Sequence, residues 1–344
     1  HGLKDVEIRY RKRYLDLIAN PEVREIFRKR SEIIRAVREF LDSKGFLEVE
    51  IPTLQPIYGG AAARPFKTFV HELKREYYLS ISPETYLKRL IVGGYKKVYT
   101  ICKNFRNESI DRTHNPEFTM MECYQAYVDY GDMMKLTEEL YEHVAKKVLG
   151  STKIEYRGKK INLKRPWKRM MMSEAIKKYA DLDVEKMDVN GLQKVIKDKN
   201  IKYEGEPNRG LMMAAIFEGL VEDKLAGPVF IIDHPKETTA LCKLHRKKHH
   251  LIERFEPYIN GWEVGNGYSE LNDPVLQREL LGDQEKQRKK GKEDVYPMDE
   301  DFIEALEVGM PPAGGLGIGI DRMIMLLTNQ ASIRDVIFFP FMKN

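Results

Sequence analysis

A run of glycines near the end of the chain constrains the fold more than any other feature of the sequence. From Gly315 to Ile320, glycine alternates with leucine or isoleucine, and Arg322 then opens an apolar segment of helical character. The run is a poor dinucleotide fingerprint, because no βαβ unit with an acidic residue about 20 positions on surrounds it. Glycines at every second position instead clear one face of a strand, so that a flat ligand can lie close to the backbone. Arg322 could then cover that ligand or contact its phosphate; the alternative is a tightly packed strand–helix junction.

A second constellation, at residues 104–124, is predicted to form two antiparallel strands joined by a polar loop. Residues two apart on a strand share a face, so Arg106 and Glu108 should project together. The returning strand places further side chains on one face: Phe118, Met120, Glu122 and Tyr124. The loop between the strands carries Arg112, His114 and Asn115. An arginine fork suits phosphate oxygens and an aromatic face suits a nucleobase; the alternative is a salt-bridged sheet face with a solvated loop.

A β-hairpin that presents two carboxylates is predicted around Asn260-Gly261. An Asn-Gly pair between apolar residues is a strong signal for a two-residue type I′ turn. That turn pairs Tyr258 with Glu263, and Glu256 then lies on the same face as a diagonal neighbour, about 7–8 Å away. Two like carboxylates would repel there unless a cation sits between them, and oxygen ligands beside a triphosphate favour Mg²⁺. The alternative is a pair of exposed glutamates on a hairpin.

Acidic and aromatic side chains from several segments indicate a pocket for a ligand with amino groups. Asn266, Tyr268 and Glu270 recur at every second position and share a face if the strand continues. Other candidates for the same pocket come from distant parts of the chain: Glu84, Glu122 and Tyr124. Several carboxylates in one place suit ammonium groups.

The predicted elements describe an α+β arrangement, with helices flanking an antiparallel sheet. Periodicity predicts helices at residues 21–44, 83–90, 130–149 and 321–327. It predicts strands at residues 46–52, 77–81, 97–105, 118–124, 227–233, 251–268 and 314–320. Residues 156–222 change to lysine-rich amphipathic stretches, which predict a helical insertion. Strands on both sides of a helical insert favour α+β over alternating βαβ units.

Composition narrows the classes of function without choosing among them. The 344 residues are 42% hydrophobic, which excludes a disordered or collagen-like chain. A net charge of +5 permits an anionic partner such as nucleic acid but does not argue for one. No apolar run approaches the roughly 20 residues needed to cross a bilayer, so no membrane partner is expected. Three cysteines without a CxxC pair favour a reduced, cytoplasmic protein without structural zinc.

Together these residues resemble the three signature motifs of class II aminoacyl-tRNA synthetases, most strongly the catalytic domain of the lysyl enzymes. Residues 44–52 resemble motif 1, which in the family contributes to a dimer interface, so a homodimer is expected. Residues 105–124 resemble motif 2, and residues 315–322 resemble motif 3. Other stretches are similar to the lysyl enzymes in particular: residues 59–66, 83–88, 114–119 and 265–274. The resemblance covers nearly all of residues 1–344, which are expected to form one catalytic domain.

The resemblance implies an ATP site made of Arg106, Glu108, His114, Asn115, Phe118, Glu256 and Arg322. Arg106 would hold the α-phosphate and the lysine carboxylate, and Glu108 the adenine amino group. Phe118 and Arg322 would sandwich the adenine, while His114 and Asn115 would help to place the triphosphate. Arg106 and Arg322 are the expected catalytic residues, and the expected ligands of Mg²⁺ are Glu256 and Glu263.

The resemblance also implies a lysine site made of Gly60, Glu84, Arg106, Glu122, Tyr124, Asn266, Tyr268 and Glu270. Gly60 and Glu84 would receive the α-amino group, while Tyr124 and Glu270 would bind the ε-ammonium. The aliphatic stem would lie against Glu122, Asn266 and Tyr268.

The expected reaction forms lysyl-adenylate and pyrophosphate from L-lysine and ATP, and then transfers lysine to the 3′ end of tRNA(Lys). Family members carry an N-terminal anticodon-binding domain, which we expect to be absent because His1–Leu17 already resembles the segment that follows it. Two other hypotheses remain open: a paralogue that attaches an amino acid to a protein lysine, and a non-catalytic binding module on the same scaffold.

Overall fold

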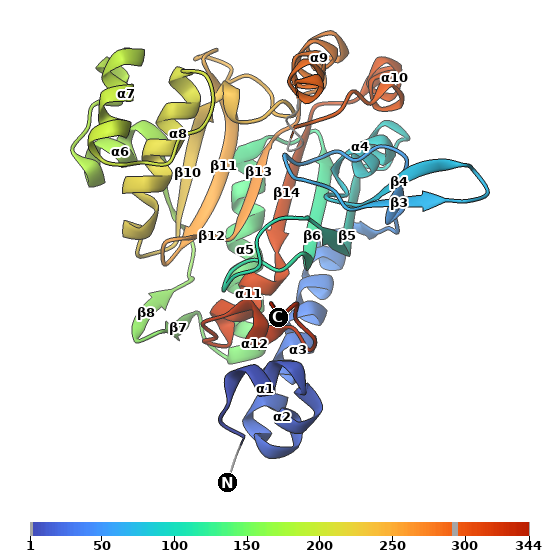
Figure 1. Cartoon of the computed structure of the whole chain (residues 1–344), viewed down its shortest axis with the longest axis vertical. Coiled ribbons are helices and arrows are strands. Elements are labelled where there is room, and N and C mark those ends of the chain that lie inside the picture. The colour runs from blue at the N-terminus through green and yellow to red at the C-terminus, as the bar shows by residue number, and fades with distance from the viewer. Residues whose placement is uncertain (1–2, 291–294, 344) are drawn as a thin grey trace.

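The structure is a computed structural model that describes residues 3–290 and 295–343 (Figure 1). Its helices are α1 (Val6–Arg11), α2 (Arg13–Ala19), α3 (Pro21–Ser43), α4 (Glu84–Val92), α5 (Tyr130–Leu149), α6 (Met172–Ala180), α7 (Val189–Asp198), α8 (Arg209–Leu220), α9 (Pro274–Lys289), α10 (Glu300–Gly309), α11 (Ile320–Leu327) and α12 (Ile333–Val336). Short 3₁₀ helices lie at Val184–Lys186, Glu222–Lys224 and Lys236–Thr238.

The strands are β1 (Leu47–Glu48), β2 (Leu54–Gln55), β3 (Lys67–Val70), β4 (Arg75–Leu79), β5 (Lys97–Phe105), β6 (Glu117–Ala126), β7 (Lys153–Tyr156), β8 (Lys159–Asn162), β9 (Lys168–Met171), β10 (Val229–Pro235), β11 (Leu251–Ile259), β12 (Trp262–Glu263), β13 (Gly265–Ser269) and β14 (Ala313–Gly319). Within the described residues, nine of them form the main sheet in the order β1-β5-β6-β14-β13-β11-β10-β9, with β12 paired to β11. The central pairs are antiparallel and the two outer pairs, β1–β5 and β9–β10, are parallel. The predicted α+β class is confirmed.

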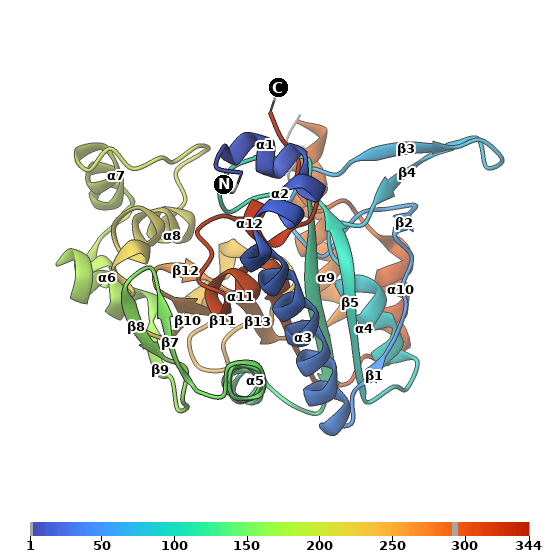
Figure 2. The same ribbon diagram turned by 90° about the horizontal axis from the view of Figure 1, so that it is seen from below.

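Helices α3 and α5 cover one face of the sheet (Figures 1 and 2). Ile33, Val37 and Leu41 recur every four residues along α3 and are buried, which is the spacing of a helix that faces a core. They belong to the same apolar cluster as Leu140 and Val144 of α5. Burying each such side chain contributes about 1.5–3 kcal/mol to stability. The helices therefore stabilise the sheet from the face that they cover.

The predicted type I′ hairpin is confirmed. Asn260 and Gly261 have φ values of 54° and 77°, and a type I′ turn requires a positive φ at both central residues. The turn pairs Tyr258 with Glu263. It also interrupts the single strand predicted over residues 251–268, which is three strands, β11, β12 and β13.

Two predicted boundaries are wrong. Residues 156–171, placed at the start of the helical insertion, contain β8 and β9, and β9 pairs with β10 of the main sheet. The segment is helical from Met172, where α6 begins, and α6, α7 and α8 flank the β9–β10 end of the sheet (Figure 1). The strand predicted over residues 46–52 is reduced to Leu47–Glu48, because only these residues pair with β5 at the sheet edge.

No helix in the described part of the chain is long and apolar enough to span a membrane.

Candidate functional site

The glycine strand β14 forms the floor of the site. It lies between β6 and β13 at the centre of the sheet. A Cβ atom built on Gly315 would lie 2.5 Å from Cε1 of Tyr124 and would clash with Oε1 of Glu270. A Cβ atom on Gly317 would lie 3.2 Å from the Met120 methyl group. The glycines therefore keep one face of the strand free of its own side chains, and Tyr124, Glu270 and Met120 take up the space beside Gly315 and Gly317.

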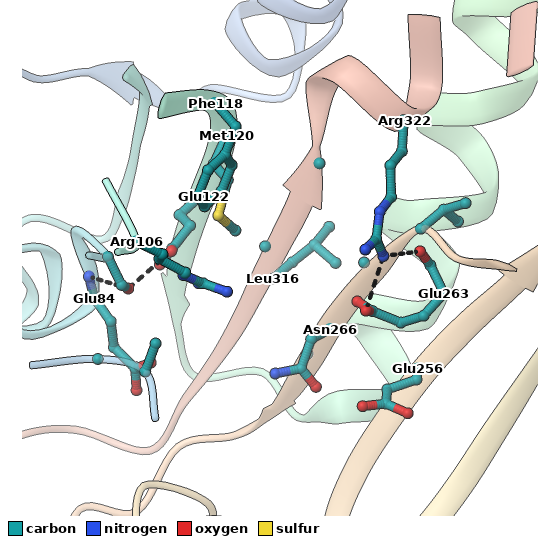
Figure 3. Close-up of a pocket in the computed structure, with 18 of the residues that line it drawn as sticks. Glu84, Arg106, Phe118, Met120, Glu122, Glu256, Glu263, Asn266, Leu316 and Arg322 are labelled. Atoms are coloured by element: carbon teal, nitrogen blue, oxygen red, sulfur yellow. Dashed lines mark hydrogen bonds and ion pairs between the residues drawn. The ribbon is translucent and has the colours of Figure 1, made fainter. Parts of the chain in front are cut away.

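A cavity of about 430 Å³ lies on this glycine face, and Gly315, Gly317 and Gly319 line it. Every residue predicted for the ATP, lysine and metal sites lines it: Gly60, Glu84, Arg106, Glu108, His114, Asn115, Phe118, Glu122, Tyr124, Glu256, Glu263, Asn266, Tyr268, Glu270 and Arg322. In Figure 3, Glu84, Glu122 and Arg106 lie on one side of β14, and Glu263 and Arg322 lie on the other.

One end of the cavity holds three buried carboxylates. Glu84, Glu122 and Glu270 are only 2%, 4% and 1% exposed. The Ser82 hydroxyl donates a hydrogen bond to Glu122 Oε1 at 2.9 Å, and the Tyr124 hydroxyl donates to Oε2 at 3.0 Å. The Tyr268 hydroxyl donates to Glu84 Oε2 at 3.0 Å. Buried carboxylates carry a large desolvation cost unless a cation or hydrogen bonds compensate it, so this end of the cavity is built for positive charge.

Burial sets the ionisation of these carboxyl groups. It raises the pKa of Glu122 to about 7, with Glu84 adding to the effect, while bonds from Ser82 and Tyr124 oppose it. Burial also raises the pKa of Glu270, and Glu84 raises it further against the opposing charge of Lys88. Oε1 of Glu270 has no hydrogen-bond partner among the residues that the structure describes. A buried hydrogen-bond acceptor without a partner is costly, and a hydrogen-bond donor of a ligand can satisfy it.

The sequence reasoning missed Lys88, which is completely buried behind the same carboxylates. Its Nζ lies 2.5 Å from Glu84 Oε1 and forms an ion pair with Glu270 Oε2. Glu84 and Lys88 are four residues apart on α4, the spacing of a helical ion pair. That spacing is visible in the sequence, but the contact with Glu270 is not.

The strand predicted at residues 97–105 is confirmed as β5, and Arg106 lies just beyond it, whereas the face that it was expected to share with Glu108 assumed a longer strand. β5 ends at Phe105, and the Arg106 backbone N–H donates to the Pro116 carbonyl at 2.9 Å. The guanidinium carbon lies 5.1 Å from the centre of the Phe118 ring. Nε and Nη2 both reach the Ile81 carbonyl at 3.4 Å, which is long for a hydrogen bond. The guanidinium is therefore held beside the cavity with donor capacity to spare.

The loop after Arg106 is ordered by an aspartate that the sequence reasoning did not single out. Asp111 accepts hydrogen bonds from the backbone N–H groups of Thr113 and His114, and it contacts Nδ1 of His114 at 2.9 Å. Burial opposes its ionisation, but the bonds from Thr113 and His114 prevail and lower the pKa of Asp111 to about 2. Asn115 donates to the Glu117 carbonyl and accepts from the Phe341 N–H. Its amide therefore anchors the last residues of the chain, and a role in placing a triphosphate stays a prediction.

The opposite end of the cavity combines two carboxylates with two arginines. Glu256 accepts from Arg254 Nη2 at 2.6 Å and from the Tyr258 hydroxyl at 2.9 Å. Arg322 Nη1 donates to the backbone carbonyl and the carboxylate of Glu263 at 2.6 Å and 3.1 Å. Burial raises the pKa of Glu263 against the charge of Arg322, and the nearby Glu256 raises it further. Arg254 and Tyr258 were not among the predicted site residues.

These two carboxylates fit a magnesium ion that shares its shell with phosphate and water. Glu256 and Glu263 come from the paired strands β11 and β12 and both face the cavity. Within the described residues, no group of three or more His, Cys, Asp or Glu side chains is arranged to hold a metal. Mg²⁺ usually keeps several waters and takes one or two carboxylates plus substrate phosphates, so a two-carboxylate site suits it.

Comparison with known proteins identifies relatives of the whole chain. Residues 5–343 match the family described as tRNA synthetases class II (D, K and N). The lysine–tRNA ligase 2 of Methanosarcina mazei is 54% identical over 344 residues, covering 100% of this chain and 67% of the relative. The lysine–tRNA ligases of Carboxydothermus hydrogenoformans and Pelotomaculum thermopropionicum are each 56% identical, covering 100% of this chain and 70% and 68% of the relatives.

Proposed function

The chain belongs to the class II tRNA synthetases of the D, K and N group, and we propose that it catalyses the lysine–tRNA ligase reaction. In the first step the lysine carboxylate attacks the α-phosphorus of ATP, and the bond to the β-phosphate breaks to release pyrophosphate. In the second step the terminal ribose hydroxyl of tRNA(Lys) attacks the carbonyl carbon of lysyl-adenylate, and AMP leaves. The identity to curated lysine–tRNA ligases supports this assignment.

The observation that carries the proposal is the set of buried carboxylates at one end of the cavity. Glu84, Glu122 and Glu270 face a substrate that brings two ammonium groups and one carboxylate. The unpaired Oε1 of Glu270 would accept from the ε-ammonium together with the Tyr124 hydroxyl. Glu84 and the backbone at Gly60 would receive the α-amino group, with Glu122, Asn266 and Tyr268 along the stem. Aspartate and asparagine bring the α-ammonium group but no second one, so they would leave a buried carboxylate at the ε-ammonium position without its partner, which costs several kcal/mol per ion.

The nucleotide would lie on the glycine face between the two ends. Phe118 and Arg322 line opposite sides of the cavity (Figure 3), as required of two groups that enclose an adenine ring. Glu108 would accept from the adenine amino group. Arg106 stands between the lysine end and the nucleotide, where its fork would hold the lysine carboxylate and an α-phosphate oxygen. His114 and Asn115 belong to the same proposal as groups that help to place the triphosphate.

The chemistry proposed needs no side-chain nucleophile. Bringing the lysine carboxylate within reach of the α-phosphorus supplies much of the rate enhancement, and Arg106 stabilises the charge that develops on the phosphoryl oxygens. Mg²⁺ when bound neutralises charge on the phosphates, and Glu256 and Glu263 would hold it. Arg254 orients Glu256 through its 2.6 Å bond, and Arg322 orients Glu263.

A homodimer and a cytoplasmic location belong to the same proposal. The apolar side chains of Leu47 and Leu54, near the segment that resembles motif 1, are each 48% exposed. Leu47 lies at the edge of the main sheet and Leu54 at the edge of the smaller sheet β2-β4-β3, and exposed apolar side chains on these neighbouring segments support association through this part of the surface. The three cysteines are free, as expected for a protein that works where tRNA is charged and thiols stay reduced.

The experiment that tests this proposal is amino-acid-dependent exchange of pyrophosphate into ATP. We expect exchange with lysine, weak exchange with ornithine, and none above background with arginine or aspartate. The variant Glu155→Gln, which changes an exposed carboxylate on β7, is the matched control and should behave as the wild type. Exchange with aspartate in place of lysine, or no exchange with any amino acid, would overturn the proposal.

A further inference from the structure

Lys88 is the one residue of the amino-acid end, among those described, that carries the same chemical group as the proposed substrate. It is 0% exposed and does not line the cavity, so it cannot itself touch a bound ligand. Its ammonium lies between Glu84 of α4 and Glu270, which follows β13. These are the two carboxylates proposed to face the two amino groups of lysine. One buried cation therefore links the carboxylate proposed for the α-amino group with the carboxylate proposed for the ε-ammonium.

The surroundings of Lys88 keep it charged. Burial disfavours its ammonium form, but the Glu270 and Glu84 carboxylates outweigh burial and raise the pKa of Lys88 above its usual value. The rings of Tyr268 and Phe302 each lie 5.9 Å from Nζ and present electron-rich faces to it. The ammonium is thus a fixed charge of the site, because it is buried away from solvent and paired with two carboxylates.

The charges of the amino-acid end can be counted. Glu84, Glu122 and Glu270 bring three negative charges when ionised, and Lys88 brings one positive charge, which leaves two negative charges. Lysine brings two ammonium groups, and its carboxylate is matched by Arg106. With Lys88 present, the occupied site is electrically balanced. Without Lys88, one buried carboxylate has no partner and takes up a proton instead.

We propose that Lys88 is a positioning and specificity residue, which holds Glu84 and Glu270 in place and sets the pocket to accept a substrate with two ammonium groups. This inference rests on the proposed function and deepens it. Lys88 acts through the two carboxylates and not on the reacting atoms. A merely structural ion pair would affect folding, but it would leave the choice between charged and neutral side chains unchanged.

The test replaces Lys88 by neutral residues and measures pyrophosphate exchange with lysine and with norleucine, which lacks the ε-ammonium. Lys88→Met keeps the length of the side chain without its charge. Lys88→Gln keeps N–H donors and is the second variant in case methionine prevents folding. Lys88→Arg retains the charge, and Lys160→Met, on the exposed face of β8, is the matched control.

Both neutral variants should raise KM for lysine at least about tenfold. Loss of the Lys88 charge raises the pKa of a neighbouring carboxyl group, and a rise of about one pKa unit lowers its ionised fraction about tenfold. KM for ATP should stay within about twofold, and the preference for lysine over norleucine in kcat/KM should fall by about the same tenfold factor. Lys88→Arg should recover part of both losses, and Lys160→Met should match the wild type.

Three results would overturn the proposal. One is a folded neutral variant whose KM for lysine and whose preference over norleucine are unchanged. Another is an equal rise of KM for lysine and ATP, which indicates general damage. The third is failure of every neutral variant to fold while Lys88→Arg folds, which makes Lys88 a structural residue only. A wild-type protein without lysine-dependent exchange would instead refute the proposed function, and the inference about Lys88 would fall with it.

Discussion

Glu122 offers the sharpest prediction, because its ionisation links the pH to both stability and lysine binding. Its carboxylate accepts hydrogen bonds from the hydroxyls of Ser82 and Tyr124 inside the core. Burial, with Glu84 close by, raises its pKa from 4.5 to about 7. Glu122→Gln removes the charge while keeping the shape and an oxygen that can accept from Ser82.

The sign and size of the effect follow from the pKa shift. The folded protein keeps the Glu122 proton up to about pH 7, whereas the unfolded chain loses it near pH 4.5. The unfolding free energy of the free protein should therefore fall as the pH rises through this window and level off above it. A difference of about 2.5 pKa units corresponds to about 3 kcal/mol, an order-of-magnitude figure for a buried carboxyl group.

The assay is equilibrium urea unfolding between pH 4 and pH 8, followed by the fluorescence of the two tryptophans, Trp167 and Trp262, of which Trp167 is buried. Subtracting the curve of Glu122→Gln from that of the wild type cancels the contributions of the other titrating groups. Between pH 4 and pH 8, the unfolding free energy of the wild type should fall by about 3 kcal/mol relative to that of Glu122→Gln. Glu155→Gln, which removes a carboxylate at an exposed position of β7, is the matched control.

Lysine should reverse this loss. The ammonium groups of lysine favour ionised Glu122, so KM for lysine should fall as the pH rises from 6 to 8, and the trend should disappear in Glu122→Gln. Parallel pH profiles for the wild type and Glu122→Gln, in stability and in KM, would refute the reasoning.

Three further predictions concern other parts of the cavity. Glu270→Gln should raise KM for lysine about 10–100-fold with KM for ATP unchanged, because it removes a charge-assisted hydrogen bond; an unchanged KM for lysine in the exchange assay would contradict the pocket assignment. Glu263→Ala should nearly abolish pyrophosphate exchange at physiological Mg²⁺, and retained activity would count against the metal hairpin. Gly315→Ala should lower stability by about 1–3 kcal/mol and suppress lysine activation, because its Cβ would clash with Glu270 and Tyr124. Gly227→Ala, where a Cβ meets nothing within 4 Å, is the control in thermal melting, and equal melting temperatures for the two variants would contradict the close packing at Gly315.

Local patterns in the sequence predicted the parts of the site that depend on strand geometry. The Asn260-Gly261 turn has one favoured conformation, and that conformation sets the register that places Glu256 and Glu263 on the same wall of the cavity. The glycines of β14 were predicted to clear one face of the strand. The structure places the side chains of Tyr124, Glu270 and Met120 in the space beside them. Both predictions succeeded because alternation along a strand is a short-range property.

Features that depend on distant contacts could not be predicted from these patterns. Residues 156–171 read as amphipathic and lysine-rich, yet β9 is a strand because β10 offers it an edge to pair with. The shared face expected for Arg106 and Glu108 assumed that the strand continues past residue 105, but β5 ends at Phe105, where the chain turns towards the loop. Lys88 follows Glu84 by one helical turn and would ordinarily be an exposed partner on the helix surface. The packing of α4 against β5, β6 and α10 instead buries it, in contact with Glu270.

A structure of the protein with L-lysine bound tests the central claim most directly. The account predicts that the ε-nitrogen lies within hydrogen-bonding distance of Glu270 Oε1 and the Tyr124 hydroxyl, with the α-amino group at Glu84 and the carboxylate at Arg106. Lysine bound elsewhere, or bound in this cavity with its ε-nitrogen directed away from Glu270 towards solvent, would contradict the account.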